Sequence, residues 1–314
     1  MKLITYKDWE SLVIKLGGEV WDGGTLPVSK IVFSTCDWVD HLFRSILEDQ
    51  NYTNQFILVS GASDFGPDYS SNRLPWEDIK RWQDMNPELN EGLGYHDFIV
   101  RSRHDKAKCL KRDKYCMRAY SWTCSTFPCI PKQISKWFCA NSNIEDSRIV
   151  NIPFGISPDT ENLLGHIAEN LPKERTGKAV ACWTNYTNER QKLKPILNEY
   201  DFHTDTVPPL EFFTRLANAR FSLCPEGNGL DSYRILESLY LGCHPIIIRN
   251  NPNASWLRAY SKITDIVSCE LYHTFNCIQT LDNLKELKCT EALYLEFWES
   301  LIDKSVESLR RLHV

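Results

Sequence analysis

The sequence has no apolar run long enough to cross a lipid bilayer. Its longest runs, such as 56–59 and 245–248, are far too short for a membrane-spanning helix. The segment from Met1 to Gly18 also lacks the continuous apolar stretch of a secretory signal, because charged residues interrupt it throughout. We therefore expect a soluble, cytoplasmic protein with no membrane span.

Metal-binding patterns are missing as well. The 12 cysteines form no C-x-x-C pair, no two of the 8 histidines lie four residues apart, and no strict D-x-D motif occurs. We therefore predict no metal site.

A chain of 314 residues can bury its own core without disulfides, so we expect its thiols to be reduced. The segment from Cys109 to Cys139 is the first place to look for a disulfide.

An excess of positive charge is also absent, since the formal net charge is -5. This disfavours nucleic acid and anionic membranes as partners. One basic stretch, 101–118, is either a solvated face or a contact for an anionic substrate. The content of 42% hydrophobic and 25% charged residues is that of a globular protein, and the length suits two domains.

In the first half of the chain, short apolar runs alternate with helical periodicity. A helix that presents Val39, Phe43, Ile46 and Leu47 on one face separates the first two expected strands. The expected order is strand 31–34, helix, strand 55–60, a helix around 130–140, strand 149–152, and a polar linker over 157–177.

The second half of the chain repeats this alternation. It predicts strand 179–183, helix 188–198, helix 209–217, strand 220–223, helix 231–241, strand 244–248, and C-terminal helices over 281–288 and 291–312. Strands joined through helices indicate parallel sheets. We predict an α/β protein with two Rossmann-like α/β/α domains facing a cleft, at 1–160 and 175–290, and a C-terminal helix at 291–314 that packs back on the first domain.

The most informative segment is 221–247, which reads as strand, glycine-bearing loop, helix, tight turn and strand. Gly227 and Gly229 allow the backbone to approach a ligand closely, and the start of the helix presents amide groups to an anion. Arg234 has a guanidinium suited to phosphate, and Glu237 can accept hydrogen bonds from a ribose diol. Together these groups would hold a nucleoside diphosphate.

Simpler interpretations of the same residues stay open. Arg234 and Glu237 can form a plain i,i+3 ion pair, and Asp231 can serve as the helix N-cap, where its charge would repel a phosphate. Gly242 suits the position after the helix C-terminus. The spacing from Gly227 to Ser232 imitates a dinucleotide fingerprint, but it comes too late in the chain and has no acidic residue at the required distance.

These residues resemble the C-terminal signature of exostosin-like, GT47-type glycosyltransferases and their smaller microbial and viral relatives. In that signature a Pro-x-Gly-x-Gly-x-Asp loop leads to Arg-x-x-Glu-x-Leu and Gly-x-x-Pro-Ile. The matching positions are Pro225, Gly227, Gly229, Asp231, Arg234, Glu237, Leu239, Gly242, Pro245 and Ile246.

Other segments are similar to the same family. The stretch 183–190 resembles a Thr-Asn…Glu-Arg element whose arginine, here Arg190, faces the donor diphosphate. The stretches 137–141 and 152–156 resemble the end of the first domain, and 35–37 and 58–64 resemble two acceptor-side loops, although the second departs from the family's His-Asn-Ser-Asp. The expected donor-binding residues are Thr184, Asn185, Arg190, Pro225, Gly227, Asn228, Gly229, Asp231, Ser232, Arg234 and Glu237.

The resemblance implies a GT-B fold and an inverting, metal-independent transfer from a UDP-sugar to a hydroxyl of a glycan acceptor, with no cofactor beyond this co-substrate. UDP-xylose, UDP-glucuronic acid and UDP-galactose are all compatible donors. Asp37 and Asp64 follow apolar strands and are candidate catalytic bases, with Glu226 as a third choice. Each of the two aspartates also has a structural interpretation, Asp37 as a helix N-cap and Asp64 in a loop turn.

Two other classes of function compete with this interpretation. One is a non-catalytic carbohydrate-binding protein on a degenerate GT-B scaffold, against which the complete set of Arg190, Arg234 and Glu237 argues. The other is a transferase that acts on DNA or on a protein side chain, and the acidic net charge disfavours DNA. A sequon at Asn185 would place a glycan beside the donor site, which favours the cytosol over the secretory route.

Overall fold

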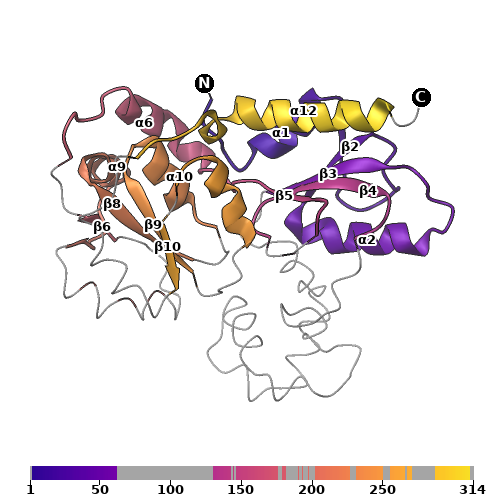
Figure 1. Cartoon of the computed structure of the whole chain (residues 1–314), viewed down its shortest axis with the longest axis horizontal. Helices are drawn as coiled ribbons and strands as arrows, with labels where there is room; N and C mark the ends of the chain where they lie inside the picture. Colours follow the sequence, from indigo (N-terminus) through magenta and orange to yellow (C-terminus); the bar gives the residue numbers. More distant parts are fainter. Residues whose placement is uncertain are drawn as a thin grey trace, which may run out of the picture.

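The chain forms two parallel β-sheets that lie side by side with helices packed around them (Figure 1). The structure is a computed structural model. It describes residues 2–61, 130–142, 144, 146–175, 179–181, 190, 193, 197, 202–226, 231–249, 255–265, 267–270 and 287–311.

The first sheet has five strands in the order β1-β2-β3-β4-β5, all parallel. Its centre is apolar, and all six residues of β3 are buried, as expected for a parallel sheet that is covered on both faces. The strands are β1 (Glu19–Val20), β2 (Ile31–Thr35), β3 (Phe56–Gly61), β4 (Ile134–Cys139) and β5 (Ile149–Asn151).

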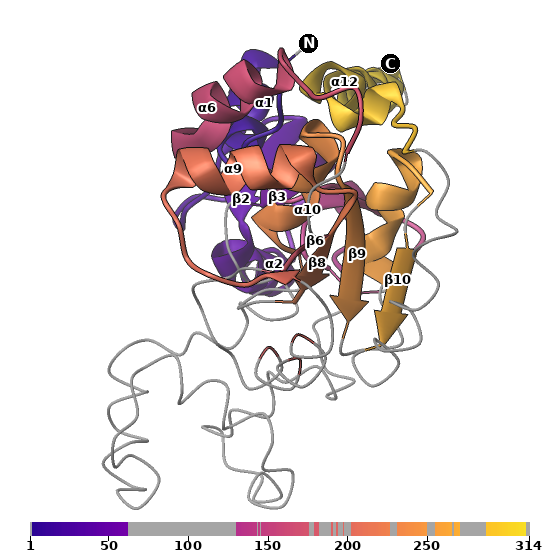
Figure 2. The same ribbon diagram turned by 90° about the vertical axis from the view of Figure 1, so that its left-hand side faces the viewer.

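Alternate residues of β2 belong to two different hydrophobic clusters. Ile31 and Phe33 pack in the cluster that contains α1 (Asp8–Lys15) and α12 (Leu295–Arg311), whereas Val32 packs in the cluster that contains α2 (Val39–Glu48). This period of two follows from strand geometry. The first sheet is therefore a middle layer, with α1 and α12 on one face and α2 on the other (Figures 1 and 2).

The second sheet has the order β10-β9-β8-β6-β7, again all parallel. Its strands are β6 (Ala179–Val180), β7 (Phe202–His203), β8 (Phe221–Pro225), β9 (His244–Arg249) and β10 (Val267–Glu270), and the helices α6 (Pro158–Ala168), α9 (Pro209–Asn218) and α10 (Tyr233–Tyr240) accompany them. Because β7 lies on one side of β6 and β8 on the other, the strand order reverses between β6 and β8.

Helix α10 has well-formed ends. Ser232 is the N-cap, and its hydroxyl accepts a hydrogen bond from the amide of Arg234. At the other end Gly242 has φ +66°, Gly242 N–H donates to Leu239 O, and Cys243 N–H donates to Ser238 O, which is the Schellman pattern. The predicted role of Gly242 is thus confirmed, but the helix begins at Tyr233 rather than at Asp231.

Three predictions about elements are wrong. The segment expected to be a helix around 130–140 contains strand β4, which pairs with β3 and β5. The expected linker contains helix α6, in which Pro158 occupies the first helical position, where proline is well tolerated. Leu47 is 53% exposed, and Leu42 is buried in its place.

Other expectations hold or lie outside the described residues. Helix 209–217 and strands 220–223 and 244–248 correspond to α9, β8 and β9, with small shifts of their ends. The C-terminal helix begins at Leu295, after the short helix η9 (Glu291–Leu293). Most of the predicted helix 188–198 and of the predicted helix 281–288 lies outside the described residues.

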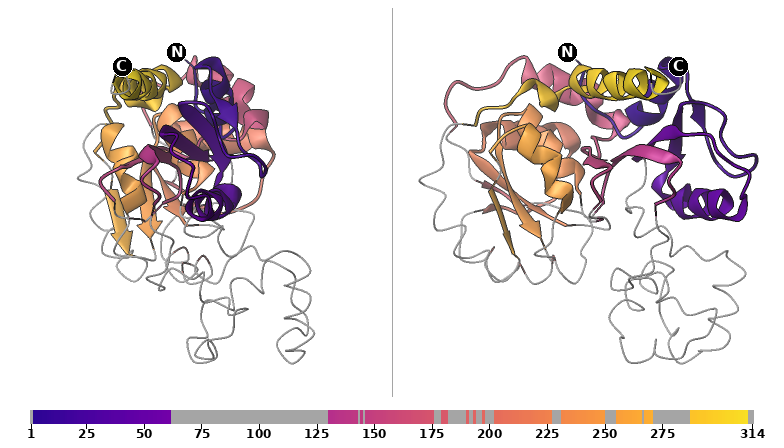
Figure 3. Two further views of the ribbon diagram at one scale, coloured as in Figure 1. Left: turned by 90° about the vertical axis from the view of Figure 1, so that its right-hand side faces the viewer. Right: turned by 45° about the vertical axis from the view of Figure 1, so that its right-hand side comes forward.

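One hydrophobic core joins the two sheets. The cluster that contains Trp9 and Phe33 of the first part also contains Phe213, Leu236 and Ile247 of the second. Helix α12 begins beside the second sheet and continues over the first, where it packs against β3 and β4 (Figure 3). No helix among the described residues is long and apolar enough to cross a membrane.

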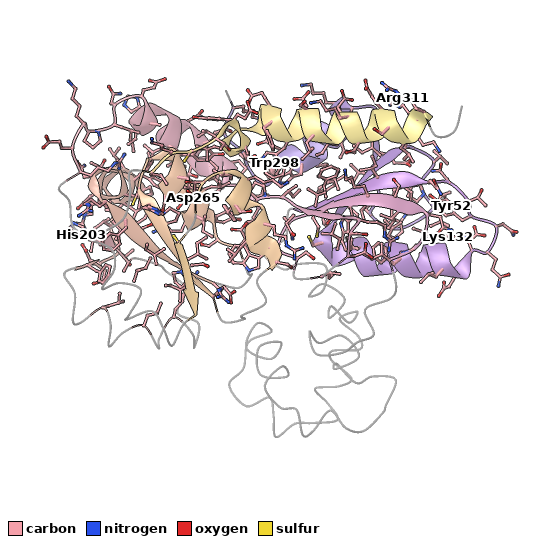
Figure 4. All side chains as sticks on the ribbon, viewed as in Figure 1. Tyr52, Lys132, His203, Asp265, Trp298 and Arg311 are labelled. Carbon is pink, nitrogen blue, oxygen red and sulfur yellow. The ribbon has the colours of Figure 1, made fainter. Side chains whose placement is uncertain are left out.

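Trp298 attaches α12 to this core. Its indole is fully buried, lies edge-on to Trp9 of α1 at 6.3 Å between ring centroids, and donates a hydrogen bond to Ala292 O at 2.8 Å. Figure 4 shows the side chain pointing down from α12 into the layer below. The C-terminal helix is therefore an integral part of the core.

Candidate functional site

The reversal of strand order between β6 and β8 marks where a ligand would bind. In open parallel α/β sheets, ligands bind beyond the carboxyl ends of the strands at such a switch point. The chain that leaves β6 leads to Arg190, and the chain that leaves β8 begins with Glu226. Arg190 Nε donates a hydrogen bond to Glu226 O at 3.2 Å. This contact connects the two segments across the switch point.

Arg190 is a buried cation, with only 9% of its surface exposed. Burial, together with the positive charge of Arg234, lowers the pKa of its guanidinium to about 10. The group is still protonated at neutral pH. Arg234, whose side chain is 21% exposed, is close enough for its charge to act on Arg190, and two such like charges favour an anion near them.

Arg234 is held in place by two partners. Its Nε donates to Glu237 Oε2 at 2.9 Å, and its guanidinium carbon lies 4.0 Å from the centre of the Phe212 ring. The i,i+3 ion pair is therefore present. The pair uses a single N–H donor of the guanidinium, so the pair itself does not exclude a phosphate contact. Phe212 had no role in the sequence prediction, because it lies one helix earlier in the chain.

Asp231 connects the two sheets. Its carboxylate accepts hydrogen bonds from Phe154 N–H at 2.9 Å, Ser232 N–H at 2.6 Å and Tyr260 O–H at 2.6 Å, while its own amide donates to Asn141 Oδ1 at 2.6 Å. Asn141 and Phe154 come from the first part of the chain. Asp231 thus holds the segment that follows the glycine loop against the first sheet.

The position of Asp231 changes its chemistry. Burial raises the pKa of the carboxyl group to about 7, although the hydrogen bonds from Tyr260, Phe154 and Ser232 act in the opposite direction. The N-cap interpretation is wrong, since Ser232 is the cap. Tyr260, in the short helix η6 (Tyr260–Lys262), was missed because nothing in its local sequence distinguishes it from a core tyrosine.

Of the three candidate bases, the structure describes the backbone of Asp37 and the whole of Glu226. Asp37 lies in the short helix η1 (Cys36–Trp38) directly after β2. Cys36 Sγ lies 3.9 Å from Ala140 O at the end of β4, one residue before Asn141, so the backbone of Asp37 is close to the contact between the sheets. Glu226 is a buried carboxyl group, 6% exposed, at the carboxyl end of β8.

Several predicted site residues lie outside the described residues. These are Asp64, Thr184, Asn185, Gly227, Asn228 and Gly229. The basic stretch 101–118 also lies outside them, as do all cysteines of the 109–139 segment except Cys139. Cys36, Cys139, Cys224, Cys243 and Cys289 are free thiols.

Pro225 ends β8 and is buried in the sheet opposite Ile248 of β9. It fixes the point at which the chain leaves β8 toward the glycine loop.

Within the described part of the chain, no three His, Cys, Asp or Glu side chains gather in a way that could hold a metal ion.

The chain is similar to glycosyltransferases. It is 32% identical to the exostosin-1 homolog of Caenorhabditis elegans over 114 residues, which are 36% of this chain and 26% of that protein. It is 32% identical to exostosin-1a of Danio rerio over 114 residues, or 35% of this chain and 14% of that protein. A probable glycosyltransferase of Arabidopsis thaliana is 21% identical over 145 residues, or 46% of this chain and 25% of that protein.

These similarities support a distant relationship to a glycosyltransferase family and agree with the resemblance drawn from 221–247. The aligned region spans about a quarter or less of the length of the curated relatives. No family model matches the chain. A small microbial or viral origin stays a prediction.

Proposed function

We propose that the chain is an inverting, metal-independent glycosyltransferase of GT-B type, which transfers a sugar from a UDP-sugar to a hydroxyl of a glycan acceptor. The donor would lie at the carboxyl ends of β6 and β8, and the acceptor on the side of the first sheet. In this proposal residues 1–160 form the acceptor-side domain and 175–290 the donor domain, with 291–314 packed on the first.

The observation that supports the proposal is that Arg190 lies at the switch point and is subject to the positive charge of Arg234. Arg190 contacts the backbone of Glu226, and the charge of Arg234 lowers the pKa of Arg190. The N-terminus of α10 adds amide groups with a positive dipole end. We expect these groups to neutralise the diphosphate as it leaves, and Glu237 to accept hydrogen bonds from the ribose.

The transfer itself needs one proton acceptor. The oxygen of the acceptor hydroxyl attacks the anomeric carbon from the face opposite the diphosphate, a new C–O bond forms, and the old C–O bond breaks with its electron pair going to UDP. A carboxylate takes the hydroxyl proton. Asp37 and Asp64 are the proposed candidates, with Glu226 as the third. Asp37 is supported by the contact of its neighbour Cys36 with Ala140.

Thermal stabilisation by nucleotides tests the donor site. We expect UDP, with EDTA present, to raise the melting temperature of the wild-type chain by mass action. Replacing Arg190 or Arg234 with Ala removes a charge-assisted hydrogen bond and is expected to weaken UDP binding about tenfold or more. Arg220→Ala is the matched control, because this exposed arginine precedes β8 at the opposite, amino end of the same strand.

Turnover then separates a transferase from a carbohydrate-binding protein. We expect the wild-type chain to release UDP slowly from one of UDP-xylose, UDP-glucuronic acid or UDP-galactose without an acceptor. Asp37→Asn, Asp64→Asn and Glu226→Gln, measured one at a time, are expected to reveal one base through a large loss of turnover. Absence of UDP binding in the wild type, or unaltered binding in both arginine variants, would refute the donor site.

A further inference from the structure

Two tryptophans form an aromatic corner at the carboxyl end of the first sheet. Trp21 directly follows β1, and Trp38 follows β2 as the last residue of η1. Their rings meet edge to face, with 6.4 Å between centroids and an angle of 81°. Trp21 is 6% exposed, whereas Trp38 is 41% exposed. A large aromatic ring thus reaches solvent at the edge of the sheet where ligands bind in this architecture.

The exposed ring of Trp38 is held in a defined position. Trp21 is anchored by a hydrogen bond from its Nε1 to Thr25 O at 3.2 Å. Gly23, which has φ +103°, lies so close that an added Cβ would be 3.3 Å from the six-membered ring of Trp38. The contacts with Trp21 and Gly23 restrict the indole of Trp38 before a ligand binds. The side chain therefore loses less conformational entropy on binding.

Trp38 lies at the same, carboxyl end of the first sheet as Asn141, which contacts the second part of the chain. It follows Asp37 in the chain, and Cys36 contacts Ala140 beside Asn141, whose side chain binds the amide of Asp231. The ends of β2 and β4 are separated by β3 alone, a span of about 10 Å at the usual strand spacing.

We propose that Trp38, supported by Trp21 and Gly23, is a binding platform for a sugar ring of the glycan acceptor. The proposal rests on the proposed function for its location and extends it to the acceptor. One face of a pyranose presents C–H groups that pack on the electron-rich face of an aromatic ring. Trp38 binds the acceptor beside the candidate base Asp37, and it is a specificity-determining residue rather than a participant in proton transfer.

The other exposed apolar side chains are less suited to this role. Leu47 on α2 and Leu210 on α9 are 53% and 58% exposed, but an aliphatic side chain has no flat π-face for a sugar ring. Trp137, which is also near the end of a strand of this sheet, is fully buried and packs edge-on against Phe43. Trp137 is therefore a core residue.

A glycan array tests the platform without depending on turnover. Wild-type chain, Trp38→Ala, Trp38→Phe and the control Leu47→Ala are applied to immobilised oligosaccharides built from glucose, galactose, xylose, N-acetylglucosamine and glucuronic acid. We expect the wild type to bind a subset of these. Trp38→Ala should bind that subset about tenfold more weakly, Trp38→Phe should stay within about threefold, and Leu47→Ala should equal the wild type.

Binding of UDP, measured on the same preparations, separates the two proposals. UDP should stabilise all four chains equally, because Trp38 and Leu47 belong to the first sheet and its helix α2, whereas the two arginines belong to the second part of the chain. Glycan binding that depends on Trp38, together with no UDP binding, would support the platform and contradict the donor site. Failure of the wild type to bind any glycan, equal binding by Trp38→Ala, or equal loss in Trp38→Ala and Trp38→Phe would overturn the platform.

Discussion

At the scale of single residues, the candidate site depends on charges that are buried rather than exposed. Arg190 is 9% exposed, Glu237 is 6% exposed, and Asp231 is 6% exposed. Burying a charged group is costly unless it is paired and hydrogen-bonded. Arg234 has its ion pair with Glu237 and its stacking on Phe212, so the sheet edge and α10 hold its guanidinium before a ligand binds.

Asp231 predicts how stability changes with pH. Its pKa is about 7 in the folded chain and about 3.9 in an unfolded chain, so the folded state binds this proton more tightly. The stability contributed by Asp231 is therefore present below about pH 4 and is lost as the pH rises through about 7. Tyr260 is the titratable group that faces it directly.

We expect Asp231→Asn to flatten this part of the pH profile, because an amide does not titrate. The free energy of unfolding, measured with urea between pH 4.5 and 8, should decline with pH less in the variant than in the wild type, by on the order of a few kcal/mol over the range. Asp265→Asn is the control, since Asp265 is exposed. Parallel profiles for Asp231→Asn and wild type would contradict the expectation.

At the scale of elements, α10 is the helix on which the donor site depends. Its C-terminus is closed by the Schellman turn at Gly242 and by Arg175, which donates to Leu241 O at 2.6 Å and also bonds Ala217 O at the end of α9. One side chain thus holds the ends of two helices. Arg234 and Glu237 are on α10. A substitution that disturbs the C-terminus of this helix should therefore displace both side chains.

Gly242→Ala should destabilise the chain by about 1–3 kcal/mol. An alanine at φ +66° is strained, and its Cβ would collide with the guanidinium of Arg175. Gly165→Ala in α6 is the matched control, because an added Cβ there meets no atom within 4 Å, and a gain of about 0.5–1 kcal/mol is expected from helix propensity. Urea unfolding measures both variants, and equal effects of the two would show that Gly242 has no special role.

At the scale of the whole molecule, the two sheets share one core and are also joined by hydrogen bonds at Asp231. The core cluster extends from Trp9 to Ile247, and Asp231 binds Asn141 and Phe154 across the contact. Phe154 also stacks on Tyr233 at the start of α10, with 5.2 Å between ring centroids. These contacts couple the donor segment to the first sheet.

We expect a single cooperative unfolding transition. Trp298→Ala should lower its midpoint temperature but should not divide it into two transitions. Removing a fully buried indole costs about 3–5 kcal/mol, whereas Ile302→Val in the same helix should cost about 0.5–1.5 kcal/mol. Calorimetry with the two variants gives the measurement. Two separated transitions in the wild type would mean that the sheets unfold independently, contrary to the shared core.

Much of the architecture could be predicted from the sequence, because the signals are local. The alternation of apolar runs and helical periodicity predicted β2, β3, β8 and β9, and the glycine after α10 predicted its C-terminus. The 221–247 motif identified Arg234 and Glu237, because residues three positions apart in a helix share a face. Arg190 was predicted by resemblance, not by local pattern.

What the sequence determined by itself was the α/β class, the C-terminus of α10 and the residues with charges suited to a diphosphate. The tertiary structure alone decided that 134–139 is a strand, that Asp231 joins the two sheets, and that Trp38 is exposed while Trp137 is buried. Local propensity depends on neighbours along the chain. Burial and hydrogen bonding depend on partners such as Asn141 and Tyr260, which lie 90 and 29 residues from Asp231, and only folding brings them together.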